Sequence, residues 1–291
     1  MDYVIPMVFD EDPWWQSDYM RLGRVYHRTA YYSINFRSWG IEHYLIKAVK
    51  KYMPFVETIH IILSRESQVQ DWMLDEGVHI VLHKDFVPDE FLPTFNSRTL
   101  EMFLHRIPGL SEQFIYGNDD IIPLSPLKEE DFFRDGLPVQ LYEFREYPDN
   151  PSNFQQPCQN GLNMIAGDFG LHFTDKWMVG GHSLSPFLKS VCEEVFENHK
   201  QEILRSITRE RRVCNYNQYI YAFQQHFANE YCDQVPPRTF LPVSLPTSKI
   251  VKTIMKDDVG ILCINDNGHT AEFAEKKEAI CNALKRKIEN Y

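Results

Sequence analysis

In the first 120 residues, short apolar segments of strand length alternate with amphipathic segments of helix length. Strand character is concentrated at residues 3–9, 58–63, 78–83 and 113–116. Between the first two, the apolar side chains of residues 41–52 follow the 3.6-residue period of a helix. Asn96 or Ser97 is placed to cap a further helix before the fourth strand. This alternation predicts βαβ units, a largely parallel sheet and therefore an α/β fold.

The second half of the chain is less regular. Patterns typical of helices lie at residues 162–169, 186–198 and 218–228, and strand character returns at residues 260–264 before a closing helix. We predict a single domain over residues 1–291. Its core would comprise residues 1–145 and 235–291, and residues 160–232 would form a helical insertion over the sheet edge.

Acidic residues follow three of the predicted strands. Asp10 and Asp12 come after the first strand, Asp119 and Asp120 after the fourth, and Asp266 after the last. Because ligands bind beyond the carboxyl ends of parallel strands, we expect these groups to converge. Carboxylate oxygens suit Mg²⁺ or Mn²⁺, which in turn hold diphosphate oxygens. The alternatives are a capped turn for the Asp119–Asp120 pair and solvated loops for the other groups.

Two further features are suited to contacting a phosphate. His182 lies in the stretch 180–183, which is rich in glycine and accessible, where an imidazole can act as an acid, a base or a phosphate partner near neutral pH. Four arginines lie between residues 205 and 212, among them Arg211 and Arg212, and their forked donors match phosphate. The alternatives are a surface histidine and a solvated helix face.

The overall charge excludes one class of partner. The net charge is -11, whereas nucleic-acid binding requires a basic surface. The longest apolar runs are far below the roughly 20 residues that span a bilayer, and the first residues have no pattern of a secretion signal. The six cysteines have neither C-x-x-C nor zinc-site spacing. We therefore expect a cytoplasmic protein with reduced thiols.

Three runs in the middle of the chain form a long and specific pattern: LPTFNS at residues 92–97, LHRIPGLSE at 104–112 and FIYGNDD at 114–120. Together they closely resemble the second conserved region of the Stealth family. That family comprises bacterial capsular and exopolysaccharide hexose-1-phosphate transferases and the animal N-acetylglucosamine-1-phosphotransferase that marks lysosomal enzymes. Further stretches are similar to the other conserved regions in the same order: residues 2–14, 181–186, 217–223 and 263–266.

The resemblance implies a fold and a reaction. The fold would be a Rossmann-like nucleotide-sugar-transferase (GT-A-like) core within a single catalytic domain. The enzyme would transfer a sugar-1-phosphate from a nucleotide-sugar, such as a UDP-N-acetylhexosamine or a UDP-hexose, to a hydroxyl of an acceptor oligosaccharide or polysaccharide. A phosphodiester would form in capsule or exopolysaccharide synthesis, and a nucleoside monophosphate would leave. Peripheral membrane association through the acceptor is compatible with this role.

The resemblance also implies site residues. Mg²⁺ or Mn²⁺ would be held by some of Asp119, Asp120 and Asp266. Either Asp120 or His182 would take the proton of the acceptor hydroxyl. The transferring phosphate would be stabilised by Arg211 or Arg212. The residues expected to bind the nucleotide-sugar are Asp10, Asp12, Asn96 and Arg106.

Two other functions fit the same pattern. A metal-dependent glycosyltransferase would share the core and the acidic strand ends but would form a glycosidic bond. A carbohydrate-binding protein without activity would bind glycan and leave the nucleotide-sugar intact. The released nucleotide separates these cases, because only the phosphotransferase releases a nucleoside monophosphate.

Overall fold

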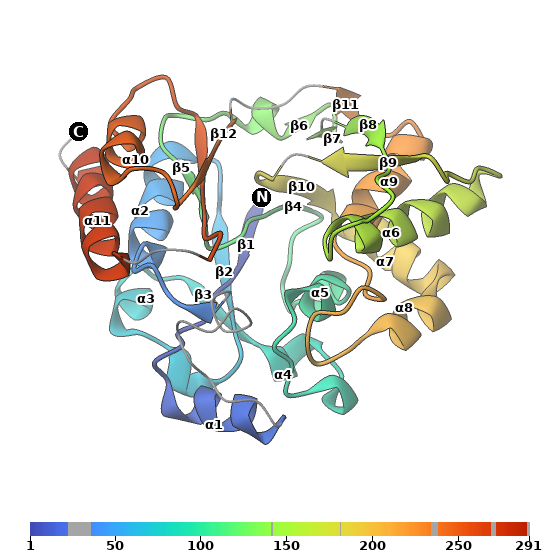
Figure 1. The fold of residues 1–291 in the computed structure, drawn as a ribbon, viewed down its shortest axis with the longest axis horizontal. Coiled ribbons are helices and arrows are strands. Elements are labelled where there is room, and N and C mark those ends of the chain that lie inside the picture. Colours follow the sequence, from blue (N-terminus) through green and yellow to red (C-terminus); the bar gives the residue numbers. More distant parts are fainter. Residues whose placement is uncertain (23–35, 141, 181, 234–237, 269–271, 290–291) are drawn as a thin grey trace.

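The central sheet of the molecule has five strands in the order β10-β4-β1-β2-β3 (Figure 1). The structure is a computed structural model that describes residues 1–22, 36–140, 142–180, 182–233, 238–268 and 272–289. Within the sheet only β10 runs antiparallel, and it pairs with β4. The five strands are β1 (Asp2–Pro6), β2 (Thr58–Leu63), β3 (His79–Leu82), β4 (Gln113–Tyr116) and β10 (Ser185–Leu188). The predicted α/β fold with a mostly parallel central sheet is therefore confirmed.

A second sheet continues from the end of β4. It contains β5 (Ile121–Pro123), β13 (Ile261–Asn265) and β12 (Arg238–Pro242), with β13 between the other two. β12 and β13 are parallel, whereas β13 runs antiparallel to β5 and places Cys263 opposite Ile121. The ends of β4 and β13 therefore lie beside each other, although they are far apart in the sequence.

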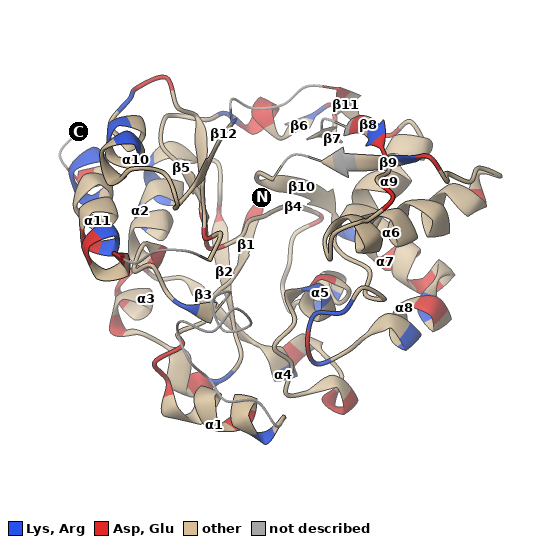
Figure 2. Ribbon diagram, in the orientation of Figure 1, with Lys and Arg blue, Asp and Glu red and all other residues tan. Residues whose placement is uncertain are grey.

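Both faces of the central sheet are covered, because side chains alternate between the faces along each strand. Tyr3 and Ile5 pack on one side in a core with α2 (Glu42–Tyr52) and α11 (Phe273–Glu289). Val4 points the other way, into a core with α6 (Gln155–Asp168), α7 (Lys189–Asn198) and α9 (Tyr219–Phe227). Figure 1 shows these two groups of helices on opposite sides of the sheet. Figure 2 shows that charged residues gather on the helices and loops around mostly uncharged strands.

The remaining elements are short. They are α1 (Pro13–Arg21), α3 (Asp71–Asp75), α4 (His83–Phe86), α5 (Ser97–Glu101), α8 (Lys200–Ser206) and α10 (Thr247–Ile254), with 3₁₀ turns at Glu66–Gln68, Asp89–Phe91, Leu104–Arg106 and Glu129–Asp131. The minor strands are β6 (Phe133–Arg134), β7 (Leu137–Gln140), β8 (Tyr142–Glu146), β9 (Lys176–Gly180) and β11 (Cys232–Asp233). Among the described residues, no helix combines the length and the apolar character needed to cross a bilayer.

One predicted element was wrong in a way that matters for the site. Residues 186–198 have the pattern of a helix, but α7 begins only at Lys189, and the preceding residues form strand β10. Pro186 lies on this strand opposite Ile115. Proline is tolerated in an edge strand because no sheet partner is needed on its outer side. The predicted insertion at residues 160–232 thus contributes a strand to the central sheet as well as helices, and its boundaries stay a prediction.

Candidate functional site

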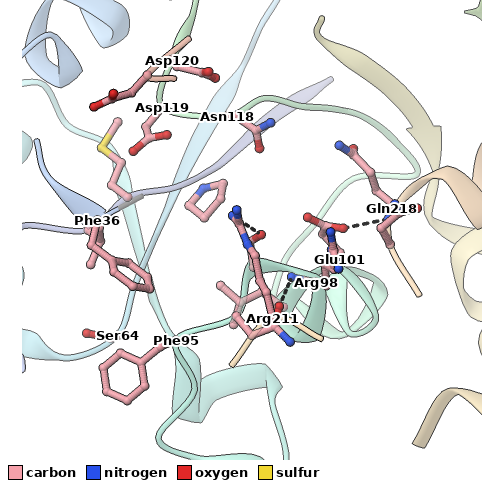
Figure 3. Close-up of a pocket in the computed structure, with 18 of the residues that line it drawn as sticks. Phe36, Ser64, Phe95, Arg98, Glu101, Asn118, Asp119, Asp120, Arg211 and Gln218 are labelled. Carbon is pink, nitrogen blue, oxygen red and sulfur yellow. Dashed lines mark hydrogen bonds between the residues drawn. The ribbon is translucent and has the colours of Figure 1, made fainter. Parts of the chain in front are cut away.

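A cavity of about 300 Å³ opens beyond the carboxyl ends of the parallel strands (Figure 3). One side is formed by residues 6–8 at the end of β1, residues 118–120 after β4 and residues 264–266 at the end of β13. The other side is formed by α5 with its cap and by Arg211 and residues 217–219. This is the edge at which parallel α/β sheets bind ligands, and the volume suits a small molecule.

The turn after β4 presents two carboxylates to this cavity. Its backbone is closed by a hydrogen bond from Ile121 N to Asn118 O at 3.1 Å, and Asp120 O accepts from Ile264 N of β13 at 2.8 Å. Gly117 is required just before the turn, since a Cβ there would lie 2.3 Å from the Tyr3 hydroxyl. The pairing of β4 with β1 and the hydrogen bond from β13 to Asp120 O therefore fix the positions of Asp119 and Asp120.

Asp119 has a strongly perturbed carboxyl group. Burial, followed by the negative charges of Asp120 and Glu42, raises the pKa of Asp119 to about 7. The positive charge of Arg211 acts in the opposite direction but does not cancel the effect. A carboxyl group that resists ionisation beside other carboxylates marks a place where a cation or a proton is stabilised.

Asp120 is the centre of a small polar cluster. Its Oδ2 lies 3.4 Å from His182 Nε2, 3.4 Å from Cys263 Sγ and 3.5 Å from Asn265 Nδ2. Its Oδ1 is buried and has no hydrogen-bond partner among the residues that the structure describes. The ligand atoms of Asp120, His182 and Cys263 all lie within 4.8 Å of one another. Asp120 and His182 are predicted site residues, whereas Cys263 is predicted as a reduced thiol within the stretch 263–266 and without a role in the site.

The imidazole of His182 is influenced by opposing effects. Burial lowers its pKa, but the hydrogen bond to Asp120 and the charges of Asp120 and Asp119 outweigh burial, so that the pKa of His182 is raised overall. Its side chain is 35% exposed and reaches the cavity. Gly181, which belongs to the same predicted motif, lies outside the described residues.

Asp266 lines the same cavity, but both of its carboxylate oxygens accept strong hydrogen bonds. Arg37 donates from Nε at 2.6 Å and from Nη2 at 2.8 Å, and Trp39 Nε1 donates at 2.8 Å. The two partners of this bidentate pair are largely buried, with side-chain exposures of 5% and 15%. Asp266 therefore stands in an ion pair at the cavity wall, and its predicted role as a metal ligand stays a prediction.

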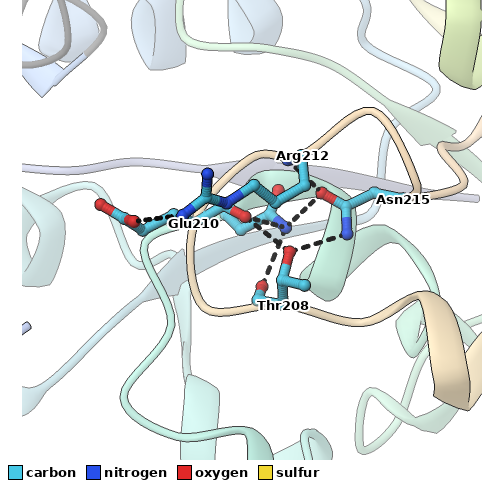
Figure 4. Close-up of polar contacts among 5 residues, drawn as sticks. Thr208, Glu210, Arg212 and Asn215 are labelled. Atoms are coloured by element: carbon cyan, nitrogen blue, oxygen red, sulfur yellow. Dashed lines mark hydrogen bonds and ion pairs between the residues drawn. The ribbon is translucent and has the colours of Figure 1, made fainter.

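The two neighbouring arginines that the sequence left as alternatives face different surroundings. Arg211 lines the cavity and donates from Nη2 to Ser97 Oγ at 3.0 Å. Arg212 is not among the lining residues, and its exposed guanidinium pairs with Glu210 at 3.4 Å. Figure 4 shows how Thr208, Glu210, Arg212 and Asn215 shape this loop. Figure 3 places Arg211 across the cavity from Asp119 and Asp120.

Asn96 lies at the cavity wall and connects two segments. Its side-chain oxygen accepts from Arg98 N at 3.2 Å and caps α5, so Asn96 is the cap of the two residues that the sequence offers. Its amide nitrogen donates to Thr208 O at 2.9 Å and to Asn215 Oδ1 at 3.0 Å. These bonds hold the loop that carries Arg211 against α5.

Three residues predicted to bind the nucleotide-sugar do not line the cavity. Asp12 caps α1, accepting from Trp14 N at 3.0 Å and from Ser67 Oγ at 2.6 Å. Asp10 is fully buried and accepts from Ser38 N at 3.3 Å. The guanidinium of Arg106 lies over the rings of Phe103 and Phe196, with its carbon 5.1 Å and 4.7 Å from their centroids. The cavity lining shows where side chains lie and does not test nucleotide binding, so the roles of Asp10, Asp12 and Arg106 stay predictions.

The sequence did not single out a buried charged group on the opposite wall. Glu101 accepts from Gln218 N at 2.8 Å, and burial raises the pKa of its carboxyl group. Arg98 lies beside it, and burial lowers the pKa of its guanidinium. The run 97–101 does contain these charges, but only the fold shows that they face a cavity rather than solvent.

Comparison with known proteins identifies a segment that supplies residues to both sides of the cavity. Residues 35–140 match the model of Stealth protein CR2, conserved region 2. The chain carries a Stealth conserved region 2. This region includes Asn96, Glu101, Asp119 and Asp120, whereas His182 and Arg211 come from later segments.

Similar proteins extend over most of the chain. The capsular polysaccharide phosphotransferase of Actinobacillus suis is 26% identical over 291 aligned residues, which cover 91% of this chain and 76% of that protein. The capsular polysaccharide phosphotransferase WcwK of Streptococcus pneumoniae is 26% identical and covers 99% of this chain and 96% of that protein. Among solved structures, mouse xyloside xylosyltransferase 1 in its apo form is similar with a TM-score of 0.41 and 8% identity, covering 92% of this chain and 99% of that one.

Proposed function

We propose that this protein is a polysaccharide phosphotransferase that moves a sugar-1-phosphate from a nucleotide-sugar to a hydroxyl of an acceptor oligosaccharide or polysaccharide. The observation that carries the proposal is the cavity in which the Asp120–His182 pair faces Arg211. The Stealth region and the names of the similar proteins support the same class of reaction.

The proposed reaction is a displacement at phosphorus. The oxygen of the acceptor hydroxyl forms a bond to the phosphorus that carries the sugar. The bond between that phosphorus and the bridging oxygen of the diphosphate breaks, and a nucleoside monophosphate leaves with the electron pair. Such chemistry depends mainly on positioning and on neutralising charge.

His182 is the group that we propose takes the acceptor proton. With Nε2–H donating to Asp120, Nδ1 carries the lone pair that accepts a proton. Asp120 then orients the ring and stabilises the imidazolium that forms, which is the role of a carboxylate in other carboxylate–imidazole pairs. The raised pKa of His182 fits this electrostatic support.

Arg211 is the group that we propose stabilises the transferring phosphate. Arg211 lines the same cavity as Asp119 and His182, and its positive charge lowers the pKa of both. A guanidinium held in place by Ser97 offers its remaining donors to phosphate oxygens without reorganising. Because Arg211 lines the cavity and Arg212 does not, Arg211 is our choice between the two predicted arginines.

Mg²⁺ or Mn²⁺ is the cofactor that we propose, and the residues present fit it. Asp120 Oδ1 is a buried anionic oxygen without a hydrogen-bond donor among the described residues. The pKa of Asp119 is raised first by burial and then by the negative charges of Asp120 and Glu42. Asp119 and Asp120 would hold the ion, with Asp266 as the predicted third ligand. When bound, the ion neutralises charge on the diphosphate.

The finer expectations concern the donor and the setting. We propose a UDP-N-acetylhexosamine or a UDP-hexose as donor and a role in capsule or exopolysaccharide synthesis in the cytoplasm. These choices follow from the Stealth resemblance, and residues after β1 at the cavity wall are where the nucleotide would lie.

The released nucleotide tests the proposal. The purified protein is incubated with UDP-N-acetylglucosamine, other UDP-sugars, Mg²⁺ and an acceptor oligosaccharide, and the nucleotides are separated by chromatography. UMP released in step with phosphodiester formation supports the proposal. Release of UDP with a new glycosidic bond would instead identify a metal-dependent glycosyltransferase. Binding of glycan with no nucleotide released would identify a carbohydrate-binding protein.

A further inference from the structure

The cluster at Asp120 contains a sulfur donor that the proposed reaction does not use. Cys263 lies on β13 directly opposite Ile121, and this pairing brings its Sγ to 3.4 Å from Asp120 Oδ2. The thiol is 1% exposed and therefore shielded from bulk solvent. Magnesium prefers oxygen ligands and does not select for a thiolate.

We propose that Asp120, His182 and Cys263 form a binding site for a thiophilic divalent cation, with Zn²⁺ as the best fit. Carboxylate oxygen, imidazole nitrogen and thiolate sulfur are the three donor types that Zn²⁺ takes in proteins, and three protein ligands leave a fourth position for water or a phosphate oxygen. This inference concerns binding and does not depend on the reaction proposed above.

The distances support a tetrahedral site. From the usual zinc–ligand bond lengths, neighbouring ligand atoms at tetrahedral angles lie about 3.3–3.6 Å apart. The two contacts of Asp120 Oδ2, to His182 Nε2 and to Cys263 Sγ, are both 3.4 Å. All three ligand atoms lie within 4.8 Å of one another. The site is therefore close to the required geometry.

The carboxylate of Asp120 offers a second oxygen to the proposed Mg²⁺ or Mn²⁺. Zn²⁺ would use Asp120 Oδ2, which faces His182 and Cys263, whereas Oδ1 is the oxygen without a hydrogen-bond donor among the described residues. Binding forms three coordinate bonds and releases the thiol proton of Cys263 to solvent, so affinity rises with pH. If the proposed function holds, the bound ion also occupies the imidazole that would take the acceptor proton.

Cobalt provides the probe, because Co²⁺ occupies zinc sites and its thiolate complexes absorb in the near ultraviolet. The reduced, metal-free full chain is titrated with Co²⁺, and bound Co²⁺ is then displaced with Zn²⁺ or with excess Mg²⁺. We expect a thiolate-to-cobalt band that saturates at one equivalent, persists in excess Mg²⁺ and disappears on addition of Zn²⁺. Cys192→Ser is the matched control, since Cys192 is equally buried but lies in α7.

Two variants make the result decisive. Cys263→Ser is expected to lose the band, and His182→Ala, whose side chain is partly exposed and tolerates truncation, is expected to bind Zn²⁺ at least about 10-fold more weakly. Absence of the band in the folded wild type, or a band that survives Cys263→Ser, would overturn the inference. A wild type that binds Co²⁺ through sulfur but releases no UMP would refute the proposed function and leave this site standing.

Discussion

The Oδ2 atom of Asp120 lies 3.4 Å from Nε2 of His182, although the two residues are 62 positions apart in the chain. The antiparallel strand β10 explains the contact. β10 begins opposite the end of β4, where Ser185 pairs with Tyr116. The residues just before β10 therefore return to the turn just after β4.

This pair should be essential for turnover. Asp120→Asn and His182→Ala are each expected to lower kcat by at least about 100-fold, the usual scale for losing an acid–base or electrostatic group. Steady-state UMP release measures the effect. His172→Ala is the control, since His172 is exposed and outside the cavity lining. Near-wild-type kcat in both variants would remove the pair from the mechanism.

The neighbouring arginines provide a matched comparison. Arg211→Ala is expected to reduce kcat/KM about 100-fold, because it removes a donor that faces the site. Arg212→Ala is expected to change kcat/KM by less than about 3-fold, because its guanidinium is exposed, pairs with Glu210 and lies outside the cavity lining. Equal losses in the two variants would show that the loop, and not the guanidinium of Arg211, matters for catalysis.

A substitution at Asp12 distinguishes a structural role of this residue from a role in nucleotide binding. Asp12→Ala is expected to reduce the free energy of unfolding by about 0.5–2 kcal/mol, because it removes the N-cap of α1. KM for the nucleotide-sugar should remain near the wild-type value, since Asp12 does not line the cavity. Urea unfolding and initial rates measure the two quantities. A large rise in KM with unchanged stability would restore the role that the sequence predicted.

Asp119 should make the stability of the metal-free protein depend on pH. The pKa of Asp119 is about 7 in the folded state, against 3.8 for an unperturbed aspartate side chain. The folded state thus holds the proton more tightly, and the free energy of unfolding falls as pH rises from about 4 to 7.

The neutral variant Asp119→Asn should lack this pH dependence. Between pH 5 and pH 8, its free energy of unfolding should therefore increase by about 1–3 kcal/mol relative to that of the wild type. Urea unfolding with a chelator present measures the difference, and Asp149→Asn, at an exposed position, is the control. Parallel pH profiles for wild type and Asp119→Asn would show that the carboxyl group titrates normally.

Much of the scaffold follows from local sequence. β2 and β4 occupy the residues whose apolar patterns predict them, and α2 fills nearly all of the predicted helix before Met53 and Pro54. Asn96 caps α5 as expected. These elements are determined by short-range periodicity and capping, which a single sequence displays. Their strand ends could therefore be placed at one edge before the structure was known.

The contacts that complete the cavity depend on long-range pairing. Arg37 and Asp266 form an ion pair although they are 229 positions apart, and no local sequence pattern predicts such a pair. Cys263 reaches Asp120 only because β13 pairs with β5. The cap role of Asp12 did have a local signal, since Pro13 follows it at the first helical position. The same acidic residues at 10–12 also have the spacing of a D-x-D motif, which favours a ligand-binding role over a helix cap.

The fate of the donor's β-phosphorus tests the central claim most directly. UDP-N-acetylglucosamine labelled with ³²P at the β-phosphate is incubated with the protein, Mg²⁺ and an acceptor oligosaccharide. We expect that the label enters the acceptor together with the sugar, that unlabelled UMP is released, and that both rates fall at least about 100-fold in Asp120→Asn. Sugar transfer with the label left in UDP would contradict it.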